Sequence, residues 1–129
     1  MTAKTCILCG ALLGGLAVAL GAFGAHGVEE YLVKHNQSTN YETAVRYQMY
    51  HALALVLVGI LAERRPGRAL NVAGWCFVGG IVLFSGALYG IALARVSQLG
   101  MVAPIGGILL ITGWAALALF AIWSKRIDS

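Results

Sequence analysis

The residues CILCGALLGGLAVALGAFGA, numbered 6–25, contain no charged side chain and decide the fold class of this chain. A helix that crosses a membrane needs about 20 mostly apolar residues, because the hydrocarbon core is about 30 Å thick. A membrane-spanning strand needs only about 9–11 residues and alternates between apolar and polar side chains. The stretch 6–25 is longer and does not alternate, so it predicts a transmembrane helix.

Three further apolar stretches follow along the chain. They read AVRYQMYHALALVLVGILA at 44–62, NVAGWCFVGGIVLFSGALYGIALA at 71–94 and MVAPIGGILLITGWAALALFAIW at 101–123. The stretch 44–62 has polar residues in its first turns, whereas the other two are almost entirely apolar. The sequence therefore predicts an all-α fold: residues 1–129 form a single transmembrane domain, a four-helix bundle in the membrane.

The composition favours a membrane protein over a soluble domain. Hydrophobic residues make up 60% of the chain and charged residues 11%, whereas charged residues make up about 25% of a typical soluble domain. So few charges would leave large apolar patches on a surface in water. The net charge of +4 comes from short basic clusters between the apolar stretches. We therefore expect the lipid bilayer, and no nucleic acid, as the partner of these residues.

The basic residues predict how the chain is oriented. Four crossings place both termini and the connection 63–70 on one side of the membrane, where six Lys and Arg residues lie, against three on the other side. Because positive charge accumulates on the cytoplasmic side, both termini are predicted to be cytoplasmic. The six residues are Lys4, Arg64, Arg65, Arg68, Lys125 and Arg126, and the three are Lys34, Arg46 and Arg95.

The longest connection, residues 27–43, is then expected on the outer side of the membrane. Its first part, VEEYLV at 28–33, predicts a short interfacial helix, and the polar residues HNQSTN at 35–40 are typical of a turn.

The first stretch also has features of a cleaved signal peptide, with Lys4 before it and Ala22-Phe23-Gly24 near its end. Its apolar run is longer than that of a usual signal peptide, so we expect it to be retained as a helix. Cys6 and Cys9 form a single C-x-x-C without a second cysteine pair. We interpret them as apolar packing residues and not as a zinc or redox site.

Small residues at helical spacing predict where the helices pack. The pattern G-x-x-x-G occurs at 10–14 and again at 86–90, and small residues continue each pattern along one helix face. This repetition predicts close contact between the first and third stretches. In the fourth stretch, two glycines after Pro104 would let another backbone approach. The residues expected to pack helices are Gly10, Gly14, Gly21, Gly86, Gly90, Gly106 and Gly107.

A polar cluster opens the second stretch. Tyr47 and His51 are four residues apart and share a helix face, and Gln48 lies near that face. Because an imidazole and an amide in hydrocarbon need partners, we expect all three side chains to face the bundle interior, with His26 and Pro104 nearby. His51 has two interpretations at this point: a neutral imidazole that holds helices together, or a ligand or proton site.

The sequence contains no arrangement typical of an enzyme. Ser85 has no partner acid or base in a recognisable motif, and there is no phosphate-binding loop and no acidic pair. His26 and His51 lack a clear third ligand, which argues against a metal or haem site. We therefore predict no catalytic residue, no metal and no cofactor.

Four motifs together resemble the domain-of-unknown-function family 423. They are GAFGAHG at 21–27, TAVRYQMYHAL at 43–53, LFSG at 83–86 and PIGG at 104–107. Each motif is weak alone, but their ordered set covers nearly the whole chain. The family contains small bacterial inner-membrane proteins and is similar to a small mitochondrial membrane protein of animals. The resemblance implies a multi-pass protein of a bacterial inner (plasma) membrane, with a four-helix fold and a retained first helix. It supplies no activity, substrate or cofactor.

Three functions are compatible with these features. The first is a non-enzymatic accessory or structural component of a larger membrane complex or homo-oligomer. The second is an oligomeric small-solute or proton-linked transporter with His51 on its path. The third is a lipid- or quinone-binding module that uses Tyr47, Gln48 and His51. A dry, packed bundle would favour the first function, and a polar-lined cavity at His51 would favour the other two.

Overall fold

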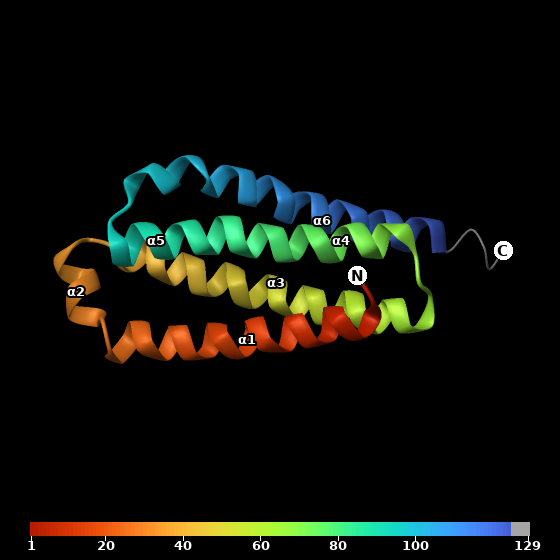
Figure 1. Cartoon of the computed structure of the whole chain (residues 1–129), viewed down its shortest axis with the longest axis horizontal. Helices are drawn as coiled ribbons and strands as arrows, with labels where there is room; N and C mark the ends of the chain where they lie inside the picture. Colours follow the sequence, from red (N-terminus) through yellow and green to blue (C-terminus); the bar gives the residue numbers. More distant parts are fainter. Residues whose placement is uncertain (125–129) are drawn as a thin grey trace.

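The computed structural model describes residues 1–124 as an arrangement of helices (Figure 1). Lys125 and Arg126, which contribute to the predicted orientation, lie outside the described residues. In chain order the elements are α1 (Ala3–His26), α2 (Glu29–Lys34), α3 (Ser38–Arg64), α4 (Arg68–Gly80), the π-helical turn η1 (Ile81–Ser85), α5 (Gly86–Ala94), the 3₁₀ turn η2 (Ser97–Met101) and α6 (Ala103–Ser124).

Four of the described segments are long and apolar enough to cross a membrane: Ala3–His26, Ser38–Arg64, Arg68–Ala94 and Ser97–Trp123. This confirms the predicted all-α fold with four membrane-spanning helices. The second helix begins at Ser38, where the sequence predicted a start near residue 44. A helix can continue beyond the hydrocarbon, so apolarity marks the part inside the membrane and not the helix ends. The connection 27–43 contains the short helix α2.

Local chemistry explains several helix ends. The hydroxyl of Thr2 accepts a hydrogen bond from the Thr5 backbone at 3.1 Å and so caps the start of α1. Two residues just after helices have positive φ angles: Asn36 after α2, with 55°, and Arg95 after α5, with 58°. A left-handed residue at these positions stops the helix and redirects the chain. Pro66 and Gly67 separate α3 from α4, since proline cannot continue a helix.

The helices pack largely in chain order. α1 lies along α3, α3 contacts α4, η1 and α5, and α4 and η1 pack against α6 (Figure 1). The first residues of the chain, the α3–α4 connection and the end of α6 gather at one end of the molecule, and α2 and η2 lie at the other. Lys4, Arg64 and Arg68 therefore share one end, as the predicted topology requires, while the cytoplasmic assignment of that end stays a prediction.

The repeated glycine pattern predicted close contact between the first and third helices, and this prediction is wrong for the glycines it rested on. The two helices touch at another place, near the N-terminal end, where a Cβ atom at Gly74 would lie 3.3 Å from the sulfur of Cys6. α1 packs mainly on α3, and the approach is close because glycines lie on both helices. A Cβ atom at Gly10 would be 2.8 Å from the carbonyl oxygen of Ala52, and one at Gly59 would be 2.8 Å from that of Ala3. Near the other end of α1, Gly24 leaves room for the ring of Tyr41. Small residues thus bring these two backbones together, as is typical of membrane helices.

The π-helical turn η1 is the site of a second close approach. A Cβ atom at Gly106 would lie 2.7 Å from the carbonyl carbon of Leu83 and 2.8 Å from the Cα atom of Phe84. The first turns of α6 therefore pack backbone to backbone against η1. Of the two glycines after Pro104, only Gly106 makes this contact. A Cβ atom at Gly107 would lie 3.9 Å from its nearest neighbour, in the ring of Phe84.

The prediction that Gly86 packs against another helix of the same bundle is wrong as well. Gly86 is exposed, and a Cβ atom there would meet no atom within 4 Å. A Cβ at Gly90 would meet the side chain of Leu99 from the following turn and no other helix, and one at Gly14 would make only ordinary contacts near 3.8 Å. A Cβ atom at Gly21 would lie 3.4 Å from its nearest neighbour, the Cγ1 atom of Val45. Spacing identifies a face of small residues, but it does not say which helix covers that face.

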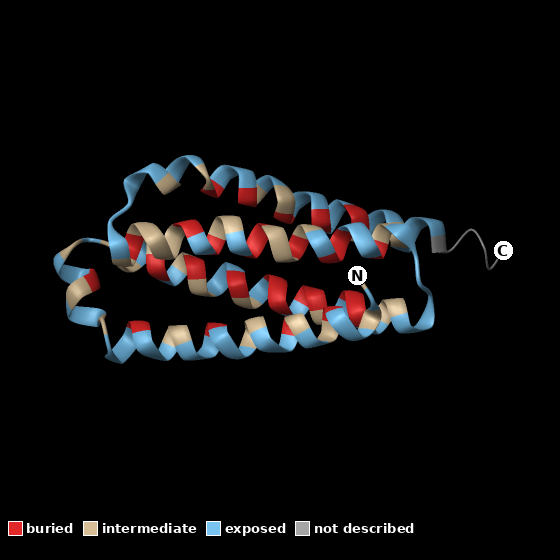
Figure 2. Cartoon of the chain, viewed as in Figure 1, coloured by how far each residue is buried: buried red, intermediate tan, exposed pale blue. Residues whose placement is uncertain are grey.

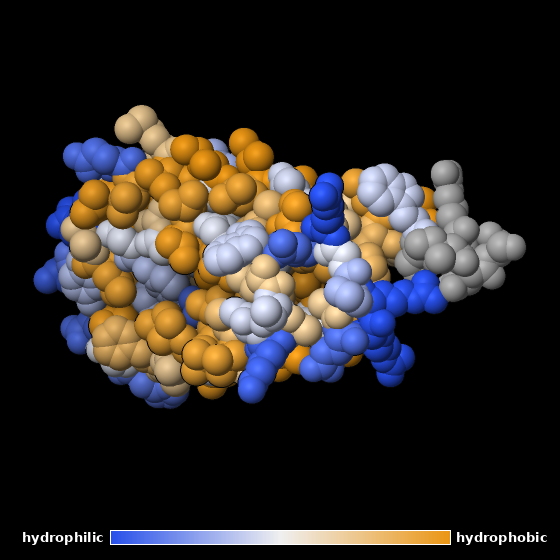
Figure 3. Space-filling view, turned by 45° about the vertical axis from the view of Figure 1, so that its right-hand side comes forward, coloured by the Kyte–Doolittle hydropathy of each residue, from blue (hydrophilic) through white to orange (hydrophobic). Residues whose placement is uncertain are grey.

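The core lies between α3, α4 and α6. Phe77, Leu55, Val58 and Leu70 are among the largest fully buried side chains, and Figure 2 shows that buried residues follow α3 and the inward faces of its neighbours. Apolar side chains also cover the outside of the bundle, and hydrophilic residues gather towards its two ends (Figure 3). A soluble protein has mostly polar side chains on its surface. An apolar surface is expected where the protein contacts lipid.

The different surroundings of Gly10 and Gly86 generate a paired prediction. Gly10→Ala should lower the free energy of unfolding by about 1–3 kcal/mol, because the added methyl group meets backbone atoms of α3 that cannot move aside cheaply. Gly86→Ala has open space, and alanine suits a helix better than glycine by about 0.5–1 kcal/mol, so it should be neutral or stabilising. Thermal unfolding in detergent micelles, followed by circular dichroism, measures both. Equal losses of stability would contradict this account of the packing.

Candidate functional site

Gln48 and His51 on α3 are two of the most deeply buried polar side chains that the structure describes. Their exposed fractions are 2% and 5%. They lie three residues apart and so occupy neighbouring positions on the inward face of the helix. Each side chain also forms hydrogen bonds with residues of other helices.

His51 connects α3 with α6. Its Nδ1 atom lies 2.6 Å from the carbonyl oxygen of Tyr47, one turn earlier in the same helix. Its Nε2 atom lies 3.1 Å from the indole Nε1 of Trp114. An indole N–H can only donate and a carbonyl oxygen can only accept. The imidazole that fits both partners is therefore neutral, with its proton on Nδ1 and a free electron pair on Nε2.

Gln48 connects three helices. Its amide nitrogen donates to the carbonyl oxygen of Leu13 in α1 at 2.9 Å. Its amide oxygen accepts a hydrogen bond from the hydroxyl of Tyr89 in α5, also at 2.9 Å. The two ends of one amide thus join α1 and α5 through α3.

Tyr41 and Ser85 extend this network towards the α2 end of the bundle. The Tyr41 hydroxyl donates to the carbonyl oxygen of Leu20 in α1 at 2.6 Å, and its ring packs edge-on against Tyr89 with centroids 5.3 Å apart. The Ser85 hydroxyl, at the end of η1, donates to the carbonyl oxygen of Ala44 at 2.8 Å. We call Tyr41, Gln48, His51, Ser85, Tyr89 and Trp114 the interhelical network.

The buried polar groups of the network all have partners. Within residues 1–124, every buried side-chain nitrogen and oxygen has a hydrogen-bond partner. Among the same residues, no three His, Cys, Asp or Glu side chains converge as metal ligands would. Most of the network's hydrogen bonds join one helix to another, so the arrangement is suited to fixing the positions of the helices.

Two of the five residues predicted for the buried cluster lie elsewhere, and a third, Tyr47, lies beside His51 but is not buried. Tyr47 is 41% exposed; its ring stacks on the imidazole of His51 with centroids 5.9 Å apart, and its backbone carbonyl accepts the His51 hydrogen bond. His26 is exposed at the end of α1 and contacts the carbonyl oxygen of Ala22 in its own helix. Pro104 is exposed in the first turn of α6, ten residues before Trp114 and hence about 15 Å along the axis.

Sequence reasoning missed four members of the network: Tyr41, Ser85, Tyr89 and Trp114. Ser85 and Tyr89 are four residues apart in an apolar stretch, a spacing that places two hydroxyls on one face and could have indicated them. Tyr41 and Trp114 gave no such signal, because tyrosine and tryptophan are common at membrane interfaces without any partner.

A surface groove lies beside His51. It has a volume of about 480 Å³, and its walls include Tyr47, Tyr50, Phe84, Leu110 and Trp114. Aromatic rings form much of this surface, with Tyr47 and Phe84 centroids 4.8 Å apart. The hydroxyls of Tyr47 and Tyr50 have no hydrogen-bond partner among the described residues, so the groove is apolar with two phenol groups.

Comparison with known proteins gives consistent matches. A family model described as "Protein of unknown function (DUF423)" matches residues 20–107. A UPF0382 membrane protein of Staphylococcus epidermidis is 46% identical over 116 residues, which cover 90% of this chain and 93% of that protein. The UPF0382 membrane protein YwdK of Bacillus subtilis is 42% identical over 120 residues, which cover 92% and 97% of the two chains. No solved structure matches.

The contact between His51 and Trp114 generates a double-mutant prediction. His51→Leu should destabilise the bundle by about 1–2 kcal/mol, since it leaves the Trp114 N–H without an acceptor. Trp114→Phe removes the donor and keeps a ring. The loss of unfolding free energy in the double mutant should differ from the sum of the two single losses by about 0.6 kcal/mol, the average for hydrogen bonds between membrane helices. Unfolding titrations in mixed micelles measure the cycle, with the exposed Tyr50→Phe as a neutral control. Strictly additive effects would show that the contact does not hold α6 to α3.

Proposed function

This chain belongs to the DUF423 family of proteins of unknown function, and we propose that it acts as a non-enzymatic component of a membrane protein assembly. It is a small multi-pass membrane protein with bacterial relatives that are themselves named as membrane proteins. Its polar side chains inside the bundle are engaged with one another, which supports a structural role for them over a catalytic one.

The proposal rests on the open space beside Gly86 in α5. Gly86, Gly90 and Ala94 follow one another at four-residue spacing; Leu99 covers Gly90, but Gly86 and Ala94 are exposed, and a Cβ atom at Gly86 would meet nothing within 4 Å. Small residues at this spacing let membrane helices approach closely, and they gain little from contact with lipid alone. A helix from a partner subunit or from a second copy of this chain would cover the face.

A second candidate is a lipid- or quinone-binding module. The aromatic groove beside His51 favours it, because Tyr47 and Tyr50 bring to an apolar surface two phenol hydroxyls that have no partner among the described residues. Proton-linked transport has less support. It requires a side chain that gains and loses a proton, and both ring nitrogens of His51 are held by Tyr47 and Trp114.

Assembly through α5 can be tested by size. Extracted from membranes with a mild detergent, the chain should migrate on a native gel well above its monomer mass of 13.6 kDa. Gly86→Leu should lower the apparent mass without loss of helix content, because the larger side chain blocks an approaching helix and meets nothing within the chain. Gly15→Leu on the exposed face of α1, where a Cβ also meets nothing within 4 Å, is the matched control. A monomeric wild-type chain would contradict the proposal.

A further inference from the structure

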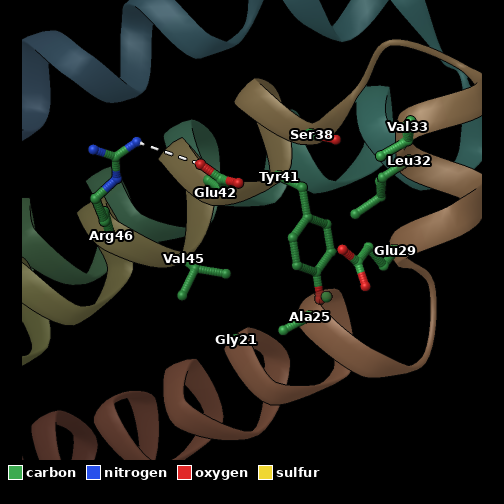
Figure 4. Close-up of a pocket in the computed structure, with 11 residues that line it drawn as sticks. Gly21, Ala25, Glu29, Leu32, Val33, Ser38, Tyr41, Glu42, Val45 and Arg46 are labelled. Atoms are coloured by element: carbon green, nitrogen blue, oxygen red, sulfur yellow. Dashed lines mark ion pairs between the residues drawn. The ribbon is translucent and has the colours of Figure 1, made fainter.

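A pocket of about 440 Å³ lies at the α2 end of the molecule, between the last turns of α1, the short helix α2 and the first turns of α3 (Figure 4). It is separate from the interhelical network except at Tyr41, whose ring forms part of its wall. Its volume falls within the range of about 300–1,000 Å³ typical of small-molecule sites.

The lengths of the surrounding helices place this pocket at the level of the lipid headgroups. α1 has 24 residues and α3 has 27, which at about 1.5 Å per residue gives about 36 and 40 Å. The hydrocarbon core is only about 30 Å thick. The ends of both helices therefore extend beyond it, and the pocket between these ends opens where phosphates and head-group amines lie.

The walls of the pocket change from apolar to charged. Leu32 is buried, and together with Gly21 and Val45 it gives the pocket an apolar surface. The charged side chains are Glu29 from α2 and Glu42 and Arg46 from α3. Figure 4 shows Glu29 and Arg46 on opposite sides of the pocket, with the guanidinium of Arg46 turned towards Glu42. An amphipathic ligand can thus place its apolar part against aliphatic side chains and its polar part among charges of both signs.

The charged groups keep binding capacity for a ligand. Arg46 and Glu42 form an ion pair at 3.9 Å, with side chains that are 58% and 68% exposed. At this distance and exposure the pair is weak, and the guanidinium has five N–H donors in all. Glu29 makes no hydrogen bond or ion pair with any residue that the structure describes. One cation and two carboxylates therefore line the pocket, which gives it a net charge of −1.

We propose that this pocket binds the headgroup of a phospholipid that carries a primary amine. The phosphate accepts hydrogen bonds from Arg46, since a guanidinium matches the geometry of phosphate oxygens. The ammonium donates to Glu29 and Glu42, and the first methylene groups of the acyl chains lie against Leu32 and Val45. The lipid thus matches both signs of charge and the apolar wall.

The same charges select against the other common lipids. A choline headgroup carries a quaternary ammonium, which has no N–H to donate to the carboxylates. A glycerol headgroup leaves the phosphate charge uncompensated, so the two carboxylates repel it. The second carboxylate is therefore the feature that sets the specificity of the pocket.

The test is lipid retention by the full chain. The protein is reconstituted in nanodiscs that contain equal amounts of ethanolamine, choline and glycerol phospholipids, and native mass spectrometry then measures which lipids stay bound after release. Ethanolamine lipid should be retained about fivefold more than choline lipid, a modest factor because exposed charge contacts are weak in water. Glu29→Gln should bring the two lipids close to equal retention.

Glu30→Gln is the matched control, because Glu30 is also exposed on α2 and does not line the pocket. It should keep the preference of the unchanged chain. Glu29 has no partner among residues 1–124, so its substitution should leave the helix content unchanged, which circular dichroism checks. Equal retention of ethanolamine and choline lipids by the unchanged chain, a preference for the glycerol lipid, or the same loss in both glutamate variants would each overturn the proposal.

Discussion

Lipid hydrocarbon neither donates nor accepts hydrogen bonds, so each polar side chain inside the bundle must find its partner within the protein. Gln48 and His51 meet this constraint by bonding to other helices. The amide of Gln48 contacts Leu13 of α1 and Tyr89 of α5, and the imidazole of His51 contacts Trp114 of α6. Hydrogen bonds from these two side chains of α3 thus reach all three other spans, although the backbone of α6 packs mainly against α4 and η1.

Close backbone approach and hydrogen bonding depend on each other in this arrangement. The carbonyl of Leu13 is reachable because Gly10, one turn earlier, lets α1 approach Ala52 of α3. On the other side of α3, Ser85 at the end of η1 reaches the carbonyl of Ala44, while Gly106 brings α6 against the same turn. The π-helical turn thus lies where α3, α6 and the third span meet. Single π-helical turns inside α-helices are rare, and they are frequently found at functional sites.

Hydropathy and length were enough to predict the four spans, because a membrane imposes the same physical requirement on every crossing segment. The high cost of an amide and an imidazole in hydrocarbon also singled out Gln48 and His51, which are buried. Their partners could not be predicted, since hydropathy carries no information on which helix faces which. The glycines illustrate the same limit. Gly86 lies in a regular pattern, yet no other helix of the chain packs against it, whereas the isolated Gly59 packs against α1.

Both ring nitrogens of His51 have protein partners, which supports the structural interpretation of this residue. The direct measurement is the ¹⁵N NMR spectrum of histidine-labelled protein in bilayers, with the His51 signals assigned by their loss in His51→Leu. The account predicts a neutral ring with its proton on Nδ1, and a through-space correlation between Nε2 and the indole N–H of Trp114. A proton on Nε2, in either the other neutral tautomer or an imidazolium, would contradict it.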